Sequence, residues 1–315
     1  MNFDVVVVGE LNVDLLLNGI QSFPSIGSEI LADHMKLALG SSSAIFASNI
    51  STLGARVKFI GKVGDDDFGE FCINCLKQKN IDVASIRKDT GSGTGLTVVM
   101  NYGEDRAMVT YQGAMKSFSL NDIDFNDLKD VKHLHFASIF LQPAIAPQIH
   151  TLFKKAKEMG LTVSFDTQYD PSNKWDVDLK SVLPLVDVFL PNISEFKALT
   201  RTDDWQQGMM NYKDYANIIA MKAGQKGSYV FQNNNIKHCE PFLNENVVDA
   251  IGAGDSFNAG FIYQFVQGAS LEECQTFGNL MGAINTTAAG GTSAFISKKN
   301  IIEFAKQRFN ISINL

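Results

Sequence analysis

Short apolar segments that alternate with helix-like segments constrain the fold of this chain more than any other feature. Residues 5–8 are four consecutive valines, which is typical of a strand buried on both faces of a parallel sheet. Similar runs recur at residues 57–60, 134–136, 162–165, 186–190 and 229–231. Residues 148–159 have a helical pattern that ends at Gly160, with lysines in the last turns. This alternation predicts an α/β fold with a doubly wound, mainly parallel sheet flanked by helices.

Two pairs of strand-like segments interrupt this alternation. They cover residues 13–17 with 29–39, and residues 95–100 with 106–111; residues 101–105 form a Gly-containing loop suited to a hairpin. We expect these segments to form a small β-sheet lid, inserted from about residues 12–39 and 94–113, that can cover a site. Because no linker or repeat divides the rest, residues 1–315 are predicted to form a single α/β domain.

The charge and cysteine content narrow the class of partner. The net charge is −7, from 27 basic and 34 acidic residues, and there is no basic block, so neither nucleic acid nor a membrane surface is an expected partner. The apolar run near the N-terminus is too short for a signal peptide or a membrane span. Four cysteines are too few for a disulfide scaffold. These features predict a cytoplasmic protein with a small-molecule ligand.

Residues 249–261 carry the clearest indication of chemistry. Val247 and Val248 are expected to end a strand, and three phenylalanines spaced four apart predict a helix that follows. Gly252, Ala253 and Gly254 would then open the helix. Unpaired N–H groups and the positive end of the helix dipole make such a turn an anion-binding site, and phosphate is the expected anion.

Asp255 stands at the mouth of this predicted anion site. A carboxylate beside a phosphate is costly unless it has a function, and accepting the proton of an attacking hydroxyl is the natural one. The alternative is that Asp255 only caps the helix. The segment is not a Walker loop, which needs Gly-Lys-Ser/Thr. It also lacks the third Gly of the dinucleotide fingerprint, because Phe257 stands there, so a dehydrogenase is disfavoured.

The same segment resembles the C-terminal signature of the ribokinase-like carbohydrate kinases (the PfkB family), Asp-Thr-x-Gly-Ala-Gly-Asp-x-Phe. It matches at residues 249, 252–255 and 257, although Ala250 replaces the usual Thr. Further segments resemble family elements in the family's order: residues 9–14, 53–54 with 61–69, 94–95 with 103–106, 192–195 and 222–227. The resemblance implies a ribokinase-like fold and an ATP- and Mg²⁺-dependent kinase that phosphorylates a sugar hydroxyl. Asp255 would be the base, and Gly252, Ala253 and Gly254 would hold the transferred phosphate.

The resemblance also assigns the other site residues. Those on the substrate side are Asn12, Asp14, Gly40, Ser41, Ile45, Arg106 and Asp166; those on the nucleotide side are Asn192, Glu195, Lys222, Gly224, Gly227 and Asn279. Glu195 would bind Mg²⁺ through water. In some family members Asp249, with the loop that contains Gly290, Gly291 and Ser293, holds a monovalent cation such as K⁺. Plainer explanations exist for several of these residues: a surface Asp at a strand end for Asp14, a capping box for Asn192 and Glu195, and an exposed mid-helix Asn for Asn279.

Departures from the family pattern bear on the substrate. Residues 40–45 lack the Lys that phosphofructokinase-type members use for a sugar phosphate, and Ile45 replaces an Asn that contacts the sugar. Asp170 replaces the Arg of the Asp-x-Asn-x-Arg element of acid-using relatives, which removes a carboxylate clamp. We therefore expect a small neutral sugar, ribose- or fructose-like. The alternatives are a nucleoside, a 2-keto-3-deoxygluconate-type sugar acid held by Arg106, and a non-catalytic sugar sensor. The lid sheet of this family often pairs across a dimer, so a homodimer is also expected.

Overall fold

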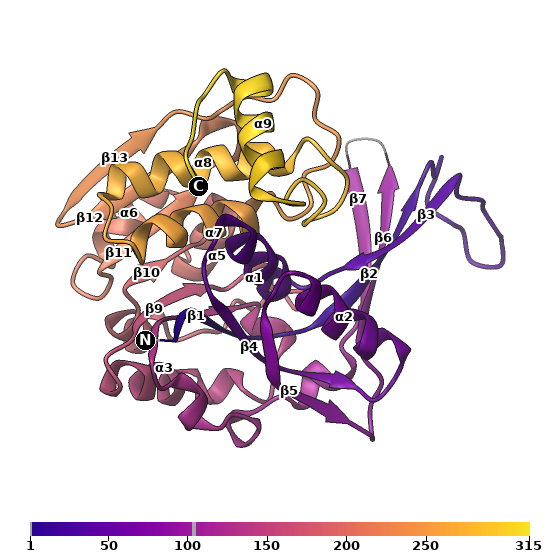
Figure 1. Cartoon of the computed structure of the whole chain (residues 1–315), viewed down its shortest axis with the longest axis horizontal. Helices are drawn as coiled ribbons and strands as arrows, with labels where there is room; N and C mark the ends of the chain where they lie inside the picture. Colours follow the sequence, from indigo (N-terminus) through magenta and orange to yellow (C-terminus); the bar gives the residue numbers. More distant parts are fainter. Residues whose placement is uncertain (1, 103–104) are drawn as a thin grey trace.

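The computed structural model describes residues 2–102 and 105–315, and the larger of its two sheets is mainly parallel. The strands of this sheet are β1 Phe3–Val8, β4 Val57–Gly64, β5 Asp82–Asp89, β8 Val131–Ala137, β9 Thr162–Asp166, β10 Val188–Phe189, β11 Ile218–Lys222, β12 Ser228–Gln232 and β13 Asn235–Cys239. Their order in the described residues is β13-β12-β11-β10-β9-β8-β1-β4-β5 (Figure 1). Neighbouring strands from β11 to β5 are parallel, whereas β12 pairs antiparallel with both β11 and β13.

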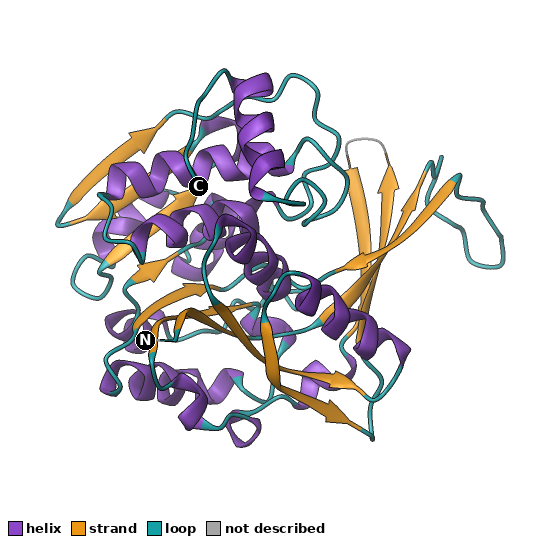
Figure 2. Cartoon of the chain, in the orientation of Figure 1, coloured by secondary structure: helices purple, strands orange, loops and turns teal. Residues whose placement is uncertain are grey.

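Helices cover both faces of this sheet (Figure 2). One face carries α3 Ile149–Glu158, α4 Leu179–Val182, α5 Ile193–Thr200 and α6 Trp205–Asn211, and the other carries α1 Ser42–Leu53, α2 Asp67–Gln78 and α7 Ala253–Phe265. Helices α8 Leu271–Asn285 and α9 Lys298–Phe309 form a further apolar cluster beside α7. Short 3₁₀ helices lie at Gly113–Ser117, Leu120–Asp122, Phe125–Leu128, Ile139–Leu141, Ala146–Gln148, Leu183–Leu185 and Gly224–Lys226. The predicted α/β fold with a doubly wound, mainly parallel sheet flanked by helices is confirmed.

The valine run explains why β1 lies in the middle of the sheet. Val6 and Val8 pack into the apolar cluster on one face, and Val5 and Val7 into the cluster on the other. All four side chains are fully buried. A strand without a polar face is stable only where helices cover both sides of the sheet, as they do here.

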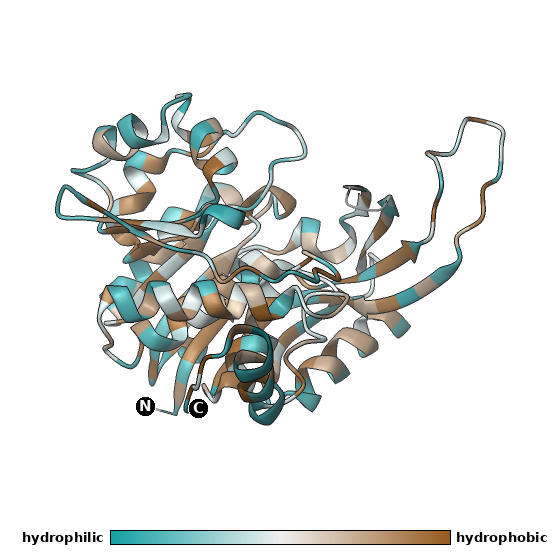
Figure 3. Cartoon of the chain, turned by 90° about the horizontal axis from the view of Figure 1, so that it is seen from above, coloured by the Kyte–Doolittle hydropathy of each residue, from teal (hydrophilic) through white to brown (hydrophobic). Residues whose placement is uncertain are grey.

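A separate four-stranded sheet stands off the main one and forms the lid (Figures 1 and 3). Its strands are β2 Asn12–Asn18, β3 His34–Leu39, β6 Gly95–Tyr102 and β7 Asp105–Tyr111, in the order β3-β2-β6-β7. The predicted hairpin joins β6 to β7, and Gly103 and Glu104 of its loop lie outside the described residues. The expectation of a strand over residues 29–33 is wrong. β3 pairs with β2 only as far as His34 opposite Asn18, and residues 29–33 lie in the projecting loop beyond this pair.

The expected strand end at Val247 and Val248 is also wrong. The chain between β13 and α7 has no regular secondary structure, and the two side chains are 58% and 60% exposed. The N–H of Val248 donates to the carbonyl of Thr286, which follows α8, instead of to a neighbouring strand. Among the described residues, none of the helices has the length and apolar content needed to span a membrane.

Candidate active site

Polar side chains from the carboxyl ends of two strands meet the first turns of α7. Asp166 ends β9 and Lys222 ends β11, and the Lys222 Nζ lies 2.6 Å from the Asp166 Oδ2. Asn258, on α7, donates from Nδ2 to the same Asp166 oxygen at 2.6 Å. Burial alone would lower the pKa of Lys222, but the carboxylates of Asp166 and Glu195 raise it above its ordinary value. Lys222 therefore stays charged at this edge of the sheet, where open α/β folds bind ligands.

Asp255 lies in the first turn of α7 and is 7% exposed. Burial and the negative charge of Asp166 raise its pKa to about 8, a value suited to a group that accepts a proton near neutral pH. The side chain of Gln168 donates from Nε2 to the Asp255 Oδ1 at 2.9 Å. The carboxylate is therefore held in one orientation rather than exposed freely to solvent.

The turn before Asp255 has the geometry of an anion site. Gly252 precedes α7 with a φ of 76°, in the left-handed region that favours glycine. A Cβ at this position would come 2.5 Å from the Cα of Gly291, so the two loops touch through glycines. No side chain of the described residues caps α7. The N–H of Ala253 donates to the carbonyl of Ala250 at 3.2 Å, so Gly254 and Asp255 present the N–H groups of this turn that an anion can use.

A cavity of about 310 Å³ opens beside this turn. It is lined by the predicted nucleotide residues Lys222, Gly224, Gly227 and Asn279, together with Ala253 and Gly254. The Asn279 Nδ2 donates to the carbonyls of Cys239 and Glu240. Apolar side chains, among them Phe242 and Leu243, line the same cavity. The cavity thus combines an apolar lining with Lys222 and the α7 anion turn. Such a lining suits a ligand made of a nucleobase and a chain of phosphates.

Glu195 and Asn192 lie beside this cluster at the start of α5. They form a reciprocal capping box, with the Asn192 N–H donating to the Glu195 Oε2 at 2.8 Å and the Glu195 N–H to the Asn192 Oδ1 at 2.8 Å. Burial and the charge of Asp166 raise the pKa of Glu195 to about 7. Asn192 also bridges to Lys222 through the backbone. A buried carboxylate that is costly to ionise fits a cation nearby, such as an Mg²⁺ ion that keeps several waters.

The predicted substrate residues on the lid lie together at its base. The Asn12 Nδ2 donates to the Asp14 Oδ1 at 3.2 Å, and burial raises the pKa of Asp14 to about 7. Gly40 lies against both, because a Cβ there would come 2.2 Å from the Asp14 Oδ1. Ser41 begins α1 and donates from Oγ to the carbonyl of Glu10 at 2.6 Å. Ile45 is 3% exposed and packs on Gly252 and Gly291.

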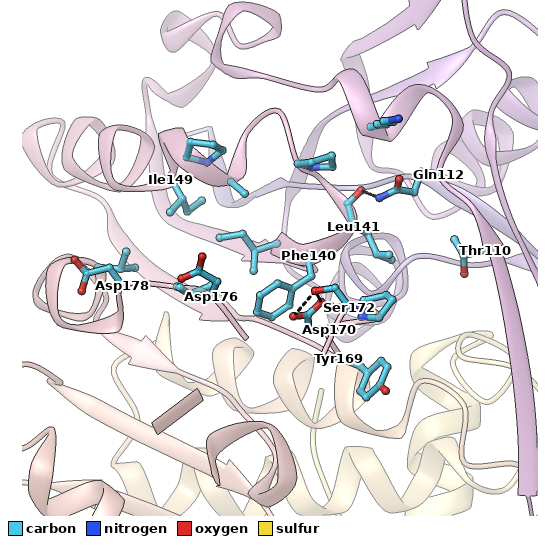
Figure 4. A pocket seen from close by; sticks show the side chains of 18 of the residues that line it. Thr110, Gln112, Phe140, Leu141, Ile149, Tyr169, Asp170, Ser172, Asp176 and Asp178 are labelled. Carbon is cyan, nitrogen blue, oxygen red and sulfur yellow. Dashed lines mark hydrogen bonds between the residues drawn. The ribbon is translucent and has the colours of Figure 1, made fainter. Parts of the chain in front are cut away.

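A larger cleft of about 1160 Å³ lies between β7 and the segments that follow β8 and β9 (Figure 4). Its lining includes Met108 and Thr110 from the lid, and Phe140 and Tyr169 from the main domain. The ionisable side chains in the lining are three aspartates, one lysine and one histidine: Asp170, Asp176, Asp178, Lys116 and His150. The cleft is therefore more negative than positive.

A family model described as pfkB family carbohydrate kinase matches residues 2–299. The chain belongs to the pfkB family of carbohydrate kinases. It is 28% identical over 273 residues to the 2-dehydro-3-deoxygluconokinase of Bacillus subtilis, covering 82% of this chain and 83% of that protein. It is 28% identical to "Probable fructokinase-6, chloroplastic" of Arabidopsis thaliana, covering 95% and 81%. The solved structure of Arabidopsis thaliana ribokinase with ribose and ATP superposes with a TM-score of 0.83 at 23% identity, covering 97% of this chain and 99% of that one.

Asp166, a predicted substrate residue of this pfkB kinase, already has hydrogen-bond partners within the protein. Asp166 is fully buried and its carboxylate accepts from Lys222, Asn258 and Gln168. This set of partners supports a role in holding the cluster together, and its predicted substrate contact stays a prediction. Arg106 lies exposed on β7, next to the hairpin loop, and its predicted role also stays a prediction.

Asp170, which replaces a family Arg, does not project into the cleft as a free carboxylate. It is 2% exposed, and its oxygens accept from the N–H of Trp175 at 2.6 Å and from the hydroxyl of Ser172 at 2.8 Å (Figure 4). Burial by itself would raise the pKa of Asp170, but these hydrogen bonds hold it below its ordinary value. Asp170 therefore organises the loop of residues 170–175. The hydrogen bonds that its carboxylate accepts partly compensate its negative charge.

The sequence did not identify three polar residues that shape the site of this kinase: Glu10, Gln168 and Asn258. Glu10 is buried directly after β1 and accepts from the Oγ of Ser43 at 2.5 Å and from its N–H at 3.2 Å, which fixes the turn before α1. Burial raises the pKa of Glu10. Gln168 follows β9 in the same way. A polar residue just beyond the carboxyl end of a parallel strand is the signal that would have pointed to both.

Proposed function

We propose that this kinase transfers the γ-phosphoryl group of ATP to a hydroxyl of a small neutral sugar, ribose- or fructose-like. The observation that supports this proposal most strongly is the position of Asp255. It is a buried carboxylate with a pKa of about 8, and it lies in the turn that presents the N–H groups of α7. The cavity beside that turn has the lining expected for ATP. The lid residues Asp14 and Asn12 offer a carboxylate and an amide for sugar hydroxyls.

The proposed reaction needs one proton transfer and one substitution at phosphorus. The hydroxyl oxygen of the sugar attacks the γ-phosphorus while Asp255 takes the hydroxyl proton. The bond from the γ-phosphorus to the oxygen of the β-phosphate breaks, and ADP leaves. The N–H groups from Gly252 to Gly254 hold the transferred group as its charge redistributes. When bound, Mg²⁺ near Glu195 would neutralise phosphate charge. Potassium is not part of this proposal, because Asp249 and its neighbours already accept hydrogen bonds from the protein.

The preference for a neutral sugar rests on charge. The lining of the large cleft has three aspartates against one lysine, and residues 40–45 contain no Lys. A sugar acid is the second candidate, because several relatives are named 5-dehydro-2-deoxygluconokinase or 2-dehydro-3-deoxygluconokinase. Arg106 on the lid is the cation that would favour it.

An ADP-release assay with fructose, ribose, 2-dehydro-3-deoxygluconate, fructose 6-phosphate and adenosine separates these candidates. We expect a neutral sugar to exceed every anionic acceptor in kcat/KM by about a hundredfold, or about 2.7 kcal/mol. A panel in which the sugar acid is preferred would refute the neutral-sugar assignment. If the Arg106→Ala variant then lost that preference, Arg106 would be the residue that binds the carboxylate of the acid. A panel in which no acceptor leads to release of ADP would favour the non-catalytic sugar sensor.

We also propose that the lid sheet pairs across a homodimer. Met35, Val109 and Tyr111 share the lid face opposite to Asp14, and they are 66%, 61% and 57% exposed. Apolar side chains gathered on one exposed sheet face favour association. Light scattering after size-exclusion chromatography should give twice the mass of a single chain. The Val109→Lys variant should give the mass of a single chain.

A further inference from the structure

The loop of residues 289–293 supports the anion turn from behind. The Cα of Gly291 packs against Gly252, and the N–H of Gly290 donates to the Asp249 Oδ2 at 2.8 Å. The position of this loop thus determines the position of the turn that presents α7 to phosphate. In some members of the family that this chain resembles, the oxygens of the corresponding loop hold a free monovalent cation. The hydrogen-bond donors around these oxygens indicate whether such a cation fits here.

The oxygens in this region already accept hydrogen bonds from nitrogen donors of the chain. The carbonyl of Ile251 accepts from the Asn285 Nδ2 at 2.6 Å, and the carbonyl of Gly291 from the Asn49 Nδ2 at 2.9 Å. The other Asp249 oxygen, Oδ1, accepts from the N–H of Ile251 at 2.9 Å. A free K⁺ ion needs several carbonyl or hydroxyl oxygens that are turned toward it and replace its water shell. Each of these oxygens therefore has less accepting capacity left for K⁺.

A positive charge is nevertheless present at the loop, and the lid supplies it. Lys36 on β3 extends its Nζ to the carbonyl of Ala289 at 3.2 Å and to the Oγ of Ser293 at 3.0 Å. A carbonyl and a hydroxyl oxygen from one turn are ligands that a monovalent cation would use. Lys36 lies opposite Leu16 in the register of the lid, and Leu16 lies against Gly290, so the lid and the loop also touch beside this contact.

We propose that the ammonium group of Lys36 takes the place of a free monovalent cation, so this kinase requires no K⁺. Lys36 is a positioning residue: it holds the loop that sets Gly291 against Gly252, and it does so from the lid. The far end of the segment is held separately, because the Lys79 Nζ binds the carbonyls of Phe295 and Ile296. Removing Lys36 should therefore loosen the end that supports the anion turn without releasing the whole segment.

The test compares wild type with Lys36→Met in K⁺ and in tetramethylammonium at equal ionic strength. The activity readout rests on the kinase function proposed above, whereas the unfolding temperature does not. We expect the wild-type rate and unfolding temperature to be the same in both salts. We expect Lys36→Met to lose about tenfold in kcat/KM, equal to about 1.4 kcal/mol, and to recover most of it in K⁺ or NH₄⁺. The unfolding temperature of this variant should rise with K⁺.

Lys299→Met is the matched control, because Lys299 is an exposed lysine that pairs only loosely with Glu303 on α9. It should match wild type in both salts. Activation of the wild type by K⁺, or a Lys36→Met variant with wild-type activity in tetramethylammonium, would overturn the proposal. If no acceptor is phosphorylated, the salt dependence of the unfolding temperature still decides the question, and only the kinase function fails.

Discussion

The side-chain amide of Gln168 joins two carboxylates of the active site: its Nε2 lies 2.9 Å from the Asp255 Oδ1 and 3.0 Å from the Asp166 Oδ2. Gln168 has a φ of 59°, a backbone conformation that is unfavourable for a residue other than glycine or asparagine. A strained residue that orients the proposed base is expected to affect how that base titrates.

Gln168→Leu should move the pH dependence of the kinase to higher pH. A hydrogen bond donated to a carboxylate favours its ionised form, so losing the bond should raise the pKa of Asp255 further above about 8. The base would then be protonated over a wider range, and kcat/KM near neutral pH should fall about tenfold. A pH profile of kcat/KM measures this. Gln267→Leu, an exposed glutamine just after the end of α7, is the control, and an unchanged profile in Gln168→Leu would contradict the positioning role.

Lys222→Met should destabilise the fold as well as weaken nucleotide binding. Lys222 and Asp166 form a buried ion pair at 2.6 Å, and removing one partner of such a pair leaves an uncompensated charge. We expect a loss of about 3–5 kcal/mol in the free energy of unfolding, measured by urea denaturation. Lys226→Met is the control, because Lys226 lies nearby in the chain but is not part of this polar cluster. Its free energy of unfolding should change little. Equal stability of the two variants would show that the ion pair contributes nothing.

Asp14→Ala should raise the KM for the sugar by about tenfold to a hundredfold, because a charged hydrogen bond is worth about 1.5–3 kcal/mol. The KM for ATP should stay within about twofold, which is below 0.5 kcal/mol, since Asp14 lies on the lid and the nucleotide cavity does not include it. Asp33→Ala, an exposed change in the lid loop, controls for lid charge. Equal increases in both constants would mean that Asp14 supports the lid structure instead of binding the sugar.

Asp255→Asn should be more stable than wild type above neutral pH. The folded-state pKa of about 8 lies above the ordinary value of about 4, so between these pH values the folded protein keeps a proton that the unfolded chain has released. The contribution of Asp255 to stability therefore falls as the pH rises from about 4 to about 8. Asn cannot ionise, so the advantage of the variant should grow over this range. Unfolding curves at several pH values measure it, and a constant difference would contradict the raised pKa.

Local patterns predicted those parts of the fold that local forces determine. The valine run at residues 5–8 predicted a strand buried on both faces, and the turn around Gly252 predicted the start of α7. The pattern failed where strand formation depends on pairing with a neighbouring strand. Val247 and Val248 have side chains typical of strands, but the N–H of Val248 donates to a carbonyl just after α8. β-propensity alone does not form a strand without a neighbour.

The polar network around the base was not predictable in the same way. Gln168 comes from the segment after β9, Asn258 from α7 and Lys222 from β11, and their side chains meet only because the sheet order brings these elements together. Lys36 and the loop at residue 290 are separated by more than 250 positions in the sequence. Such contacts depend on packing between distant segments, and no local period or spacing indicates them.

The kinetic behaviour of Asp255→Asn tests the proposed mechanism most directly. The substitution keeps the shape of the side chain and its contact with Gln168 but removes the proton acceptor. With the best acceptor from the substrate panel, kcat should fall by about 10²- to 10⁴-fold, while the Kd for ATP, measured by calorimetry, should change by less than threefold, or about 0.7 kcal/mol. A variant that keeps its turnover within about tenfold of wild type would contradict the assignment of Asp255 as the base.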